Sequence, residues 1–342
     1  MLSHHNIISN IEGIDQVFNL TKEDRLMGVL PFFHSFGVTA TIWFPLITGF
    51  GVVYHTNPMD ARTIGEMVSK YKATILISTP TFCTAYIRKC TREEFSSLRY
   101  AVVGAEKLQG SIAHEFREKF GLDLLEGYGC TEMGPVVSVN TPDIVHGNIR
   151  QKGNKPGTAG HPIPGVAVKV VDVDTGEELL FGEKGMLLVK GPGQMLGYLG
   201  QGNTLSLEII KDGWYITGDI ASIDEDGFIT IKDRLSRFSK IGGEMVPHIR
   251  IEEAVNQILK DAVCIVTSLP DDHRGERLIV LYNHREVKSY EIWKHLCESQ
   301  FPRLWIPKQD DIYYIETIPT LGSGKVDLKQ AGVIARAMAG VA

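Results

Sequence analysis

The chain of 342 residues carries 35 Lys and Arg against 41 Asp and Glu, and 43% of its residues are hydrophobic. This length predicts about two domains, and the balanced composition excludes disordered, collagen-like and small disulfide-stapled proteins. The net charge of −6 comes with scattered basic residues rather than a basic block, so we expect no nucleic-acid partner. Five cysteines without a CxxC pair are typical of a reducing compartment, and we expect a cytosolic protein.

The N-terminal region shows no targeting or membrane-spanning pattern. Its first residues, MLSHHNIISN, lack the basic and apolar regions of a signal peptide. No Asp, Glu, Lys or Arg occurs from Leu26 to Met59, but prolines and glycines such as Pro31, Pro45 and Gly49 interrupt this segment. A spanning helix needs about 20 uninterrupted apolar residues. We therefore predict buried strands, turns and a short helix here, with an apolar pocket wall as the alternative.

Helical and strand patterns alternate through the next part of the chain. Residues 62–72 and 111–120 space their apolar positions as amphipathic helices do, and 74–80, 99–106 and 122–129 are short apolar runs typical of buried strands. Strand–helix–strand units of this length predict a parallel sheet with helices on its faces. Ligands of such sheets bind beyond the carboxyl ends of the strands. We expect the turns STP, GAE and GYGCTE to lie together there.

The pattern changes after the Gly- and Pro-rich segment 152–165. Short β runs joined by DTG and DEDG turns predict antiparallel hairpins. From residue 236 onward, helices (250–259, 290–299 and a last one) mix with strands (262–269, 277–283, 311–318). The predicted fold class is α/β, with a parallel-sheet subdomain, a small antiparallel β subdomain and a separate α+β domain. The predicted boundaries are 1–150 and 156–235 within a first domain 1–235, followed by 236–342.

The segment EGYGCTE (126–132) carries groups suited to nucleotide binding. Gly127 and Gly129 let a flat base approach the backbone, and Tyr128 offers a stacking face. Thr131 provides a hydroxyl for phosphate, and Glu132 provides a hard oxygen for Mg²⁺. A glycine turn with a capping Thr and a Glu favoured by a helix dipole is the structural alternative. The segment by itself leaves both interpretations open.

Three more polar residues stand near predicted strand ends or in a glycine-rich turn. Asp219 can accept from two ribose hydroxyls, and Arg234 donates through a rigid fork. A surface ion pair between them is the alternative. Lys325 follows Gly-Ser-Gly, but the Pro at position 319 stands where a Walker loop needs its first glycine.

The chain resembles the ANL superfamily of adenylate-forming enzymes over nearly its whole length. The matching segments, in family order, are LPFFHSFG (30–37), GAEKL (104–108), EGYGCTE (126–132), GEKGMLLVKGPGQMLGY (182–198), GWYITGD (213–219), IKDRLSRFSKIGGEMV (231–246) and PTLGSGK (319–325). The amino-acid sequences of several of these segments are most similar to the acyl-ACP synthetase part of bifunctional 2-acylglycerophosphoethanolamine acyltransferases. The resemblance implies ATP-dependent activation of a fatty acid as an acyl-adenylate, and transfer to the thiol of acyl carrier protein or CoA, in phospholipid acylation.

The resemblance also implies cofactors and residue roles. Lys325 would contact the attacking carboxylate and the α-phosphate of ATP, Glu132 would orient Mg²⁺, and Thr131 would hold a phosphate oxygen. The residues that would enclose adenine and ribose in the ATP or AMP site are Gly104, Ala105, Glu106, Gly127, Tyr128 and Ile231 for adenine, and Asp219 and Arg234 for ribose.

Other matching positions concern the acyl and thiol paths. His34 would line the acyl entrance, Ser236 would be the hinge of a mobile C-terminal domain, and Lys240 and Gly243 would lie along the thiol path. Asp327 stands where many relatives carry Arg, which favours a carrier protein over CoA. Peripheral contact with a membrane surface is a further expectation for an enzyme that serves phospholipids.

One part of the family pattern would lie ahead of Met1. The Ser/Thr/Gly-rich loop that wraps the β- and γ-phosphates should precede MLSH, so we expect the C-terminal part of a larger enzyme that adenylates weakly by itself. Two rival hypotheses are an acyl- or aryl-CoA ligase without a carrier-protein role, and a non-catalytic nucleotide- or acyl-binding module. A third takes His55 and Asp60 as an acyltransferase dyad, but their place inside the adenylating region argues against it.

Overall fold

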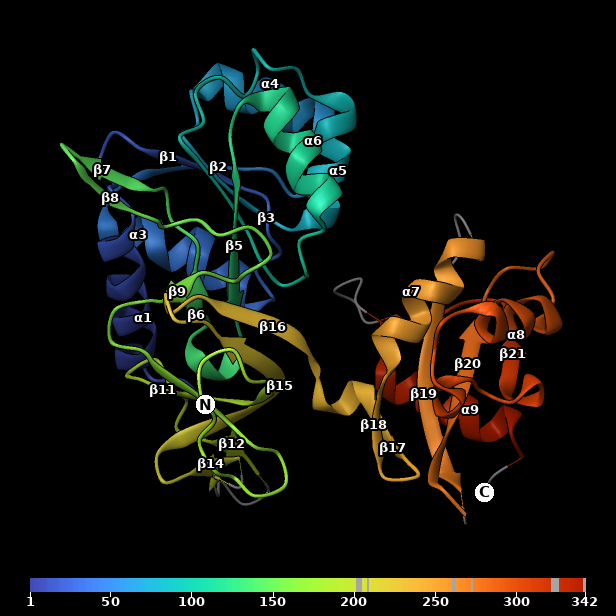
Figure 1. The fold of residues 1–342 in the computed structure, drawn as a ribbon. Coiled ribbons are helices and arrows are strands. Elements are labelled where there is room, and N and C mark those ends of the chain that lie inside the picture. The colour runs from blue at the N-terminus through green and yellow to red at the C-terminus, as the bar shows by residue number, and fades with distance from the viewer. Residues whose placement is uncertain (201–204, 208, 260–262, 272, 321–325, 341–342) are drawn as a thin grey trace. The chain divides into compact units, whose positions relative to one another are not determined.

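The computed structural model describes residues 1–200, 205–207, 209–259, 263–271, 273–320 and 326–340. The chain divides into two compact units, Met1–Lys232 and Asp233–Ala342, and each is described by itself (Figure 1). The sequence predicts a boundary at 235/236, a few residues further along the chain.

A seven-stranded sheet forms the centre of the first unit. Its strand order is β2-β1-β3-β4-β5-β6-β9, and the first five strands are parallel while β6 and β9 are antiparallel additions. The bounds are β1 Arg25–Gly28, β2 Gly51–Tyr54, β3 Ile75–Ser78, β4 Tyr100–Val103, β5 Leu124–Gly129, β6 Val136–Val139 and β9 His161–Pro162. The predicted strands 74–80, 99–106 and 122–129 are confirmed as β3, β4 and β5.

Helices cover both faces of this sheet (Figure 1). They are α1 His4–Val17, α2 Ser35–Val38, the π-helical turn η1 Thr39–Trp43, α3 Phe44–Thr48, α4 Ala61–Tyr71, α5 Pro80–Lys89 and α6 Gly110–Phe120. Strand β3 shows why two cores form, because side chains alternate along a strand. Leu76 packs with α4, α5 and α6 in one core, whereas Ile75 and Ile77 pack with α1 and α3 in the other.

The uncharged segment from Leu26 to Met59 folds as strands and short helices. It contains β1, α2, η1, α3 and β2, so strands and short helices form here as predicted. Only β1 is mostly buried, whereas the residues of β2 are half-buried or exposed. In the described part of the chain, no helix is both long enough and apolar enough to cross a bilayer. The segment still exposes large apolar side chains, among them Phe33 and Leu46, which are 72% and 70% exposed.

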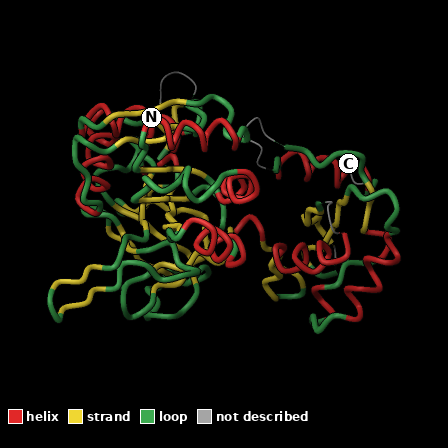
Figure 2. Tube along the Cα trace, turned by 90° about the horizontal axis from the view of Figure 1, so that it is seen from above, coloured by secondary structure: helices red, strands yellow, loops and turns green. Residues whose placement is uncertain are grey.

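The rest of the first unit is antiparallel, as predicted. One sheet has the order β10-β11-β15-β14, with β16 also paired to β15, and two hairpins, β7–β8 and β12–β13, stand apart from it. Figures 1 and 2 show the β7–β8 hairpin projecting from the unit. The bounds are β7 Ile144–His146, β8 Ile149–Gln151, β10 Ala167–Val171, β11 Gly185–Lys190, β12 Tyr198–Leu199, β13 Leu205–Ser206, β14 Ile210–Lys211, β15 Trp214–Ile223 and β16 Ile229–Arg234.

The second unit is an α+β domain, again as predicted. Its sheet has the order β18-β17-β20-β19, and β21 lies parallel to β20. One core packs α7 and α8 on one face, and a second core packs α9 on the other. The bounds are η4 Leu235–Arg237, β17 Phe238–Ile241, β18 Glu244–Pro247, α7 His248–Leu259, β19 Cys264–Asp271, β20 Gly275–Tyr282, α8 Ser289–Glu298, η5 Arg303–Trp305, η6 Gln309–Asp311, β21 Ile312–Tyr314 and α9 Leu328–Met338.

A buried histidine ties the start of α7 to β17. The Nε2 atom of His248 lies 2.6 Å from the hydroxyl of Ser239, and the His248 residue is only 3% exposed. Burial and the nearby Arg237 guanidinium lower the pKa of His248 from 6.5 to about 3. The native second unit therefore keeps His248 neutral at pH values where the unfolded chain protonates it.

We expect the stability of the second unit to fall as the pH falls from 6.5 toward 3. In this window the unfolded state binds one more proton at His248 than the folded state, which costs up to about 1.4 kcal/mol per pH unit. Hydrogen exchange of the α7 and β19 amides at a series of pH values measures the slope. The variant His248→Gln should flatten it, and the exposed control His273→Gln should not. An unchanged slope in His248→Gln would assign the pH dependence to other groups.

Candidate functional site

The turns that follow β3, β4 and β5 lie together at one edge of the parallel sheet. The strands are in register there, because Val103 pairs with Ser78 on one side and with Glu126 on the other. Glu106, in the turn after β4, accepts hydrogen bonds from the backbone N and the hydroxyl of Thr81, at 3.2 and 2.6 Å. The backbone N of Leu108 donates to Glu126, at 3.1 Å. The expected convergence of the GAE turn with its neighbours is therefore present.

The turn after β4 has an unusual backbone. Ala105 adopts a φ of +68°, in the left-handed region that non-glycine residues rarely occupy. Such strain is concentrated at ligand sites in many proteins. Gly104 is buried beside the Phe36 ring, and Ala105 and Glu106 are exposed at the sheet edge. In the predicted adenine-binding segment, Gly104 is thus buried, while the strained Ala105 is exposed at the position where parallel sheets bind ligands.

The glycines of β5 have a packing role. A Cβ atom at Gly129 would lie 2.2 Å from the carbonyl oxygen of Pro135, and one at Gly127 would lie 3.1 Å from that of Ser138. Both contacts are with the segment that leads into and forms β6. The close approach of β6 therefore explains Gly129 without a ligand, and the role of Gly127 beside adenine stays a prediction.

Two predicted nucleotide-binding residues meet although 91 positions separate them in the chain. The hydroxyl of Tyr128, on β5, donates a hydrogen bond to the carboxylate of Asp219, on β15. Asp219 is 2% exposed, and its backbone N donates to the Thr217 hydroxyl at 3.0 Å. Burial and the neighbouring Asp219 carboxylate raise the pKa of Tyr128 well above its usual range, so the phenol stays a donor. Ile231, on β16, packs against the same core cluster as Tyr128.

Thr131 and Glu132 lie in η2, the 3-10 turn Thr131–Met133 that follows β5. The Thr131 and Ser35 hydroxyls are 2.8 Å apart. The hydroxyl of Tyr198 donates to Glu132 Oε1 at 2.5 Å, and burial and this contact raise the pKa of Tyr198 to about 12. Neither Ser35 nor Tyr198 was singled out by the sequence interpretation, although both lie in segments that resemble the superfamily, 30–37 and 182–198.

Glu132 is the carboxylate that the sequence interpretation expects to orient Mg²⁺. Within the described ranges, no group of three or more His, Cys, Asp and Glu side chains could hold a metal ion. Mg²⁺ at nucleotide sites commonly takes one or two carboxylates and completes its shell with phosphate oxygens and water. Glu132, half-buried beside the exposed Thr131, fits that donor set.

His34 and the pair His55 and Asp60 lie in the first unit, and their roles stay predictions. His34 is the N-cap of α2, and its Nδ1 atom accepts from the backbone N of Phe36 at 3.2 Å. The His55 and Asp60 side chains lie 3.2 Å apart, and Asp60 also caps α4 by accepting from the Thr63 backbone N. The cap gives Asp60 a structural role.

The remaining candidates belong to the second unit or lie outside the described residues. Arg234 is the last residue of β16, Ser236 lies in η4, and Lys240 is exposed on β17, where its backbone N donates to Glu276. Gly243, in the β17–β18 turn, has a φ of +89°, and a Cβ atom added there would have no heavy atom of another residue within 4 Å in the described part of the chain, apart from its two chain neighbours. Lys325 lies outside the described residues. Convergence of these residues with Tyr128 and Asp219 stays a prediction.

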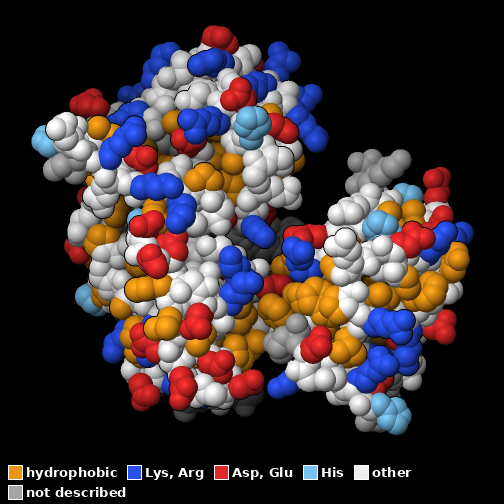
Figure 3. All heavy atoms as spheres, viewed as in Figure 1, with side chains coloured by type: hydrophobic (Ala, Val, Ile, Leu, Met, Phe, Trp, Pro, Cys, Tyr) orange, Lys and Arg blue, Asp and Glu red, His pale blue; other side chains and the backbone are white. Residues whose placement is uncertain are grey.

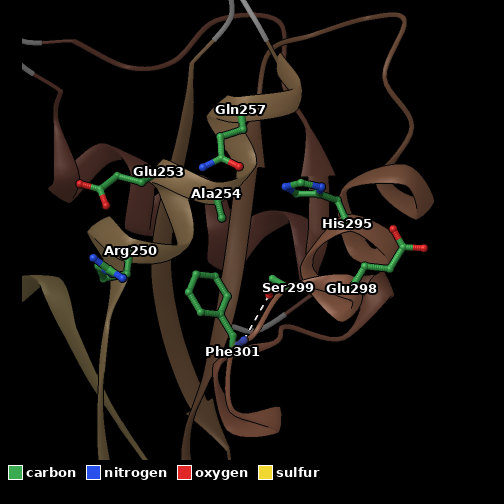
Figure 4. A pocket seen from close by; sticks show the side chains of 8 residues that line it. All are labelled: Arg250, Glu253, Ala254, Gln257, His295, Glu298, Ser299 and Phe301. Carbon is green, nitrogen blue, oxygen red and sulfur yellow. Dashed lines mark hydrogen bonds between the residues drawn. The ribbon is translucent and has the colours of Figure 1, made fainter. Parts of the chain in front are cut away.

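Two features of the second unit were not expected from the sequence. Asp327 is the N-cap of α9 and accepts from the Gln330 backbone N at 2.9 Å, which explains this Asp without reference to CoA. A cavity of about 510 Å³ lies between α7 and α8, lined by Arg250, Glu253, Ala254, Gln257, His295, Glu298, Ser299 and Phe301 (Figure 4). None of the sequence-predicted site residues in the described ranges lines it.

Charges of both signs are interspersed over the molecular face in Figure 3.

Comparisons with known proteins agree on one family. The model of the family described as "AMP-binding enzyme" matches residues 1–199. A probable 4-coumarate–CoA ligase 3 of Dictyostelium discoideum is 31% identical over 95% of this chain and 58% of its own length. A long-chain-fatty-acid–CoA ligase of Yersinia pestis is 30% identical over 95% of this chain and 57% of its own. The chain therefore spans less than three fifths of these relatives.

Solved structures show the same likeness. The crystal structure of ATP-bound MatB from Rhodopseudomonas palustris superposes with a TM-score of 0.80 at 26% identity, over 98% of this chain and 64% of that one. The o-succinylbenzoate CoA synthetase of Bacillus subtilis, in complex with its acyl-adenylate intermediate, superposes with a TM-score of 0.80 at 22% identity, over 97% of this chain and 65% of that one. The latter likeness is one of fold.

Proposed function

Because the chain belongs to the AMP-binding enzyme family of the ANL superfamily, we propose that it takes part in activating a carboxylic acid with ATP and passing the acyl group to a thiol. The observation that carries this proposal is the Tyr128–Asp219 hydrogen bond. It joins two distant segments at the sheet edge where the family resemblance expects the nucleoside, beside the strained turn at Ala105.

The described residues have the chemical groups that their proposed roles require. Tyr128 and Ile231 offer faces for adenine, while Asp219 accepts from ribose hydroxyls and is held by Tyr128. Thr131 offers a hydroxyl to a phosphate oxygen, and Glu132 would hold Mg²⁺, which supplies positive charge to the phosphates when bound. Lys325 would supply the positive charge that brings the anionic carboxylate to the α-phosphate.

We propose CoA as the first thiol to test, and a fatty acid or an aromatic acid as the substrate class. Relatives that are 30 and 31% identical carry the names of long-chain-fatty-acid and 4-coumarate CoA ligases. Acyl carrier protein in phospholipid acylation is the second candidate, because the amino-acid sequences of segments 30–37 and 240–246 resemble those of acyl-ACP synthetases. Assays that supply CoA and pantetheinylated carrier protein in parallel separate the two.

Replacement of Asp219 by asparagine tests the nucleotide site. The carboxylate is a buried, charged acceptor for ribose, so its neutralisation should weaken AMP binding by about 1.5–3 kcal/mol, or about 10- to 150-fold. Titration calorimetry with AMP measures the change, and Asp15→Asn, at an exposed position of α1, is the matched control. Equal AMP affinity in Asp219→Asn and the unaltered chain would show that the site is misplaced. No AMP binding by the unaltered chain would contradict the proposed function itself.

A further inference from the structure

One loop, residues 191–199, holds Glu132 at both its backbone and its side chain. The backbone N of Met195 donates to the Glu132 carbonyl at 2.7 Å. Three residues later, the hydroxyl of Tyr198 donates to Glu132 Oε1 at 2.5 Å. The loop thus reaches the predicted cation ligand by two independent contacts.

This loop is itself anchored to the rest of the first unit. The side-chain amide of Asn6, on α1, donates to the carbonyls of Pro192 and Gln194 at 2.7 and 2.8 Å. Asn6 is 5% exposed, so these bonds are shielded from water. A Cβ at Gly193 would lie 2.5 Å from the Met133 carbonyl, so the loop backbone packs directly on η2. The path that carries Tyr198 to Glu132 is therefore fixed along its length.

The backbone next to Tyr198 is also specialised. Gly197 has a φ of +132°, and a Cβ there would lie 2.8 Å from the carbonyl of Ser206, the residue that pairs with Tyr198 across β12–β13. A side chain at position 197 would be strained and would push the hairpin apart. Tyr198 is 46% exposed as a whole residue, and its hydroxyl donates to Glu132. The anchored loop and the backbone at Gly197 together place this hydroxyl on Glu132.

We propose that Tyr198 is a positioning residue that fixes the Glu132 carboxylate for a Mg²⁺–nucleotide complex. This inference rests on the proposed function. A glutamate side chain has several rotatable bonds, and a cation gains most from a carboxylate that is already oriented. One hydrogen bond at Oε1 restricts that rotation, and a carboxylate has two oxygens with which to accept. Tyr198 therefore acts through Glu132 and has no contact with the nucleotide in this scheme.

Tyr198→Phe removes only the hydroxyl, and calorimetry with two probes separates positioning from folding damage. We expect affinity for ATP in the presence of Mg²⁺ to fall by about 10-fold, as is usual when a partner of a metal ligand is lost. Affinity for AMP in the presence of EDTA should stay unchanged. The matched control is Tyr54→Phe, because Tyr54 is 44% exposed and its hydroxyl donates to the Thr41 carbonyl at 2.7 Å. This control should change neither affinity.

A double variant shows whether Tyr198 acts through Glu132. In a Glu132→Gln background, Tyr198→Phe should cause no further loss of Mg²⁺–ATP affinity, because residues that act as one unit are not additive. A further 10-fold loss, an unchanged Mg²⁺–ATP affinity in Tyr198→Phe, or equal losses for AMP and ATP would each overturn the inference. If the unaltered chain bound neither AMP nor ATP, the proposed function would fail and this inference would fail with it.

Discussion

Lys325→Ala is expected to lower the rate of acyl-adenylate formation by about 10²–10³-fold, the usual loss when one preorganised charge donor is removed from a transition state. The reaction of the proposed function brings a carboxylate against a phosphate, so two anions must approach each other. Lys325, which follows Gly-Ser-Gly in the segment that resembles the superfamily, is the group expected to offset that repulsion. Lys325 lies outside the described residues, so this prediction stands on the resemblance.

Separate assays of the two half-reactions make the Lys325 prediction specific. ATP–pyrophosphate exchange in the presence of a fatty or aromatic acid reports adenylation. Thioester formation from a supplied acyl-adenylate should be largely retained, because Lys240 and Gly243 are the residues expected along the thiol path. Lys329→Ala, at an exposed position of α9, is the matched control and should leave both reactions intact. Equal losses of both half-reactions in Lys325→Ala would contradict the division of labour.

Much of the fold could be predicted because apolar periodicity marks the elements that build the cores. The run at Ile75, Leu76 and Ile77 is buried on both faces of the sheet, and it is apolar at each position. Helix α1 was not predicted, because its buried face includes Asn6 and Asn10. Their amides donate to carbonyls in the segments around residues 133–136 and 192–194. Partners so distant in the chain leave no periodic signal in the sequence.

The candidate site likewise contains contacts that could be predicted from the sequence and contacts that could not. Strand order places the turns after β3, β4 and β5 at one edge, and the resemblance adds Asp219, so the meeting of Tyr128 with Asp219 could be expected. The contacts of Ser35 with Thr131 and of Tyr198 with Glu132 could not. They depend on how two loops pack, and single residues in loops carry no period. The role of Asp327 is local, because its carboxylate accepts from the Gln330 backbone N at the start of α9. A resemblance to a family position carries no information about this capping bond.

A buried ion pair between Arg237 and Glu252 stabilises the second unit. Arg237 lies beside the predicted hinge and is 8% exposed, and its guanidinium pairs with Glu252 on α7. Arg237 also donates to the Val266 carbonyl at 3.2 Å, while Glu252 Oε1 accepts from the Val266 backbone N at 2.6 Å. Burial raises the pKa of Glu252, although the Arg237 guanidinium and the Val266 backbone N–H both favour its charged form. The network therefore joins η4, α7 and β19 through groups that all need their partners.

Glu252→Ala is expected to lower the free energy of unfolding of the second unit by about 3–5 kcal/mol, because it leaves a buried guanidinium without its counter-charge and the Val266 N–H without an acceptor. Hydrogen exchange of the β17, α7 and β19 amides reports this unit separately from the first. Glu253→Ala, at the next and exposed position of α7, should stay within about 0.5 kcal/mol of the unaltered chain. Equal protection in Glu252→Ala and Glu253→Ala would mean that water or another side chain replaces Glu252 beside Arg237. In that case the segment that follows Ser236 would be tied to the second unit by contacts other than this ion pair.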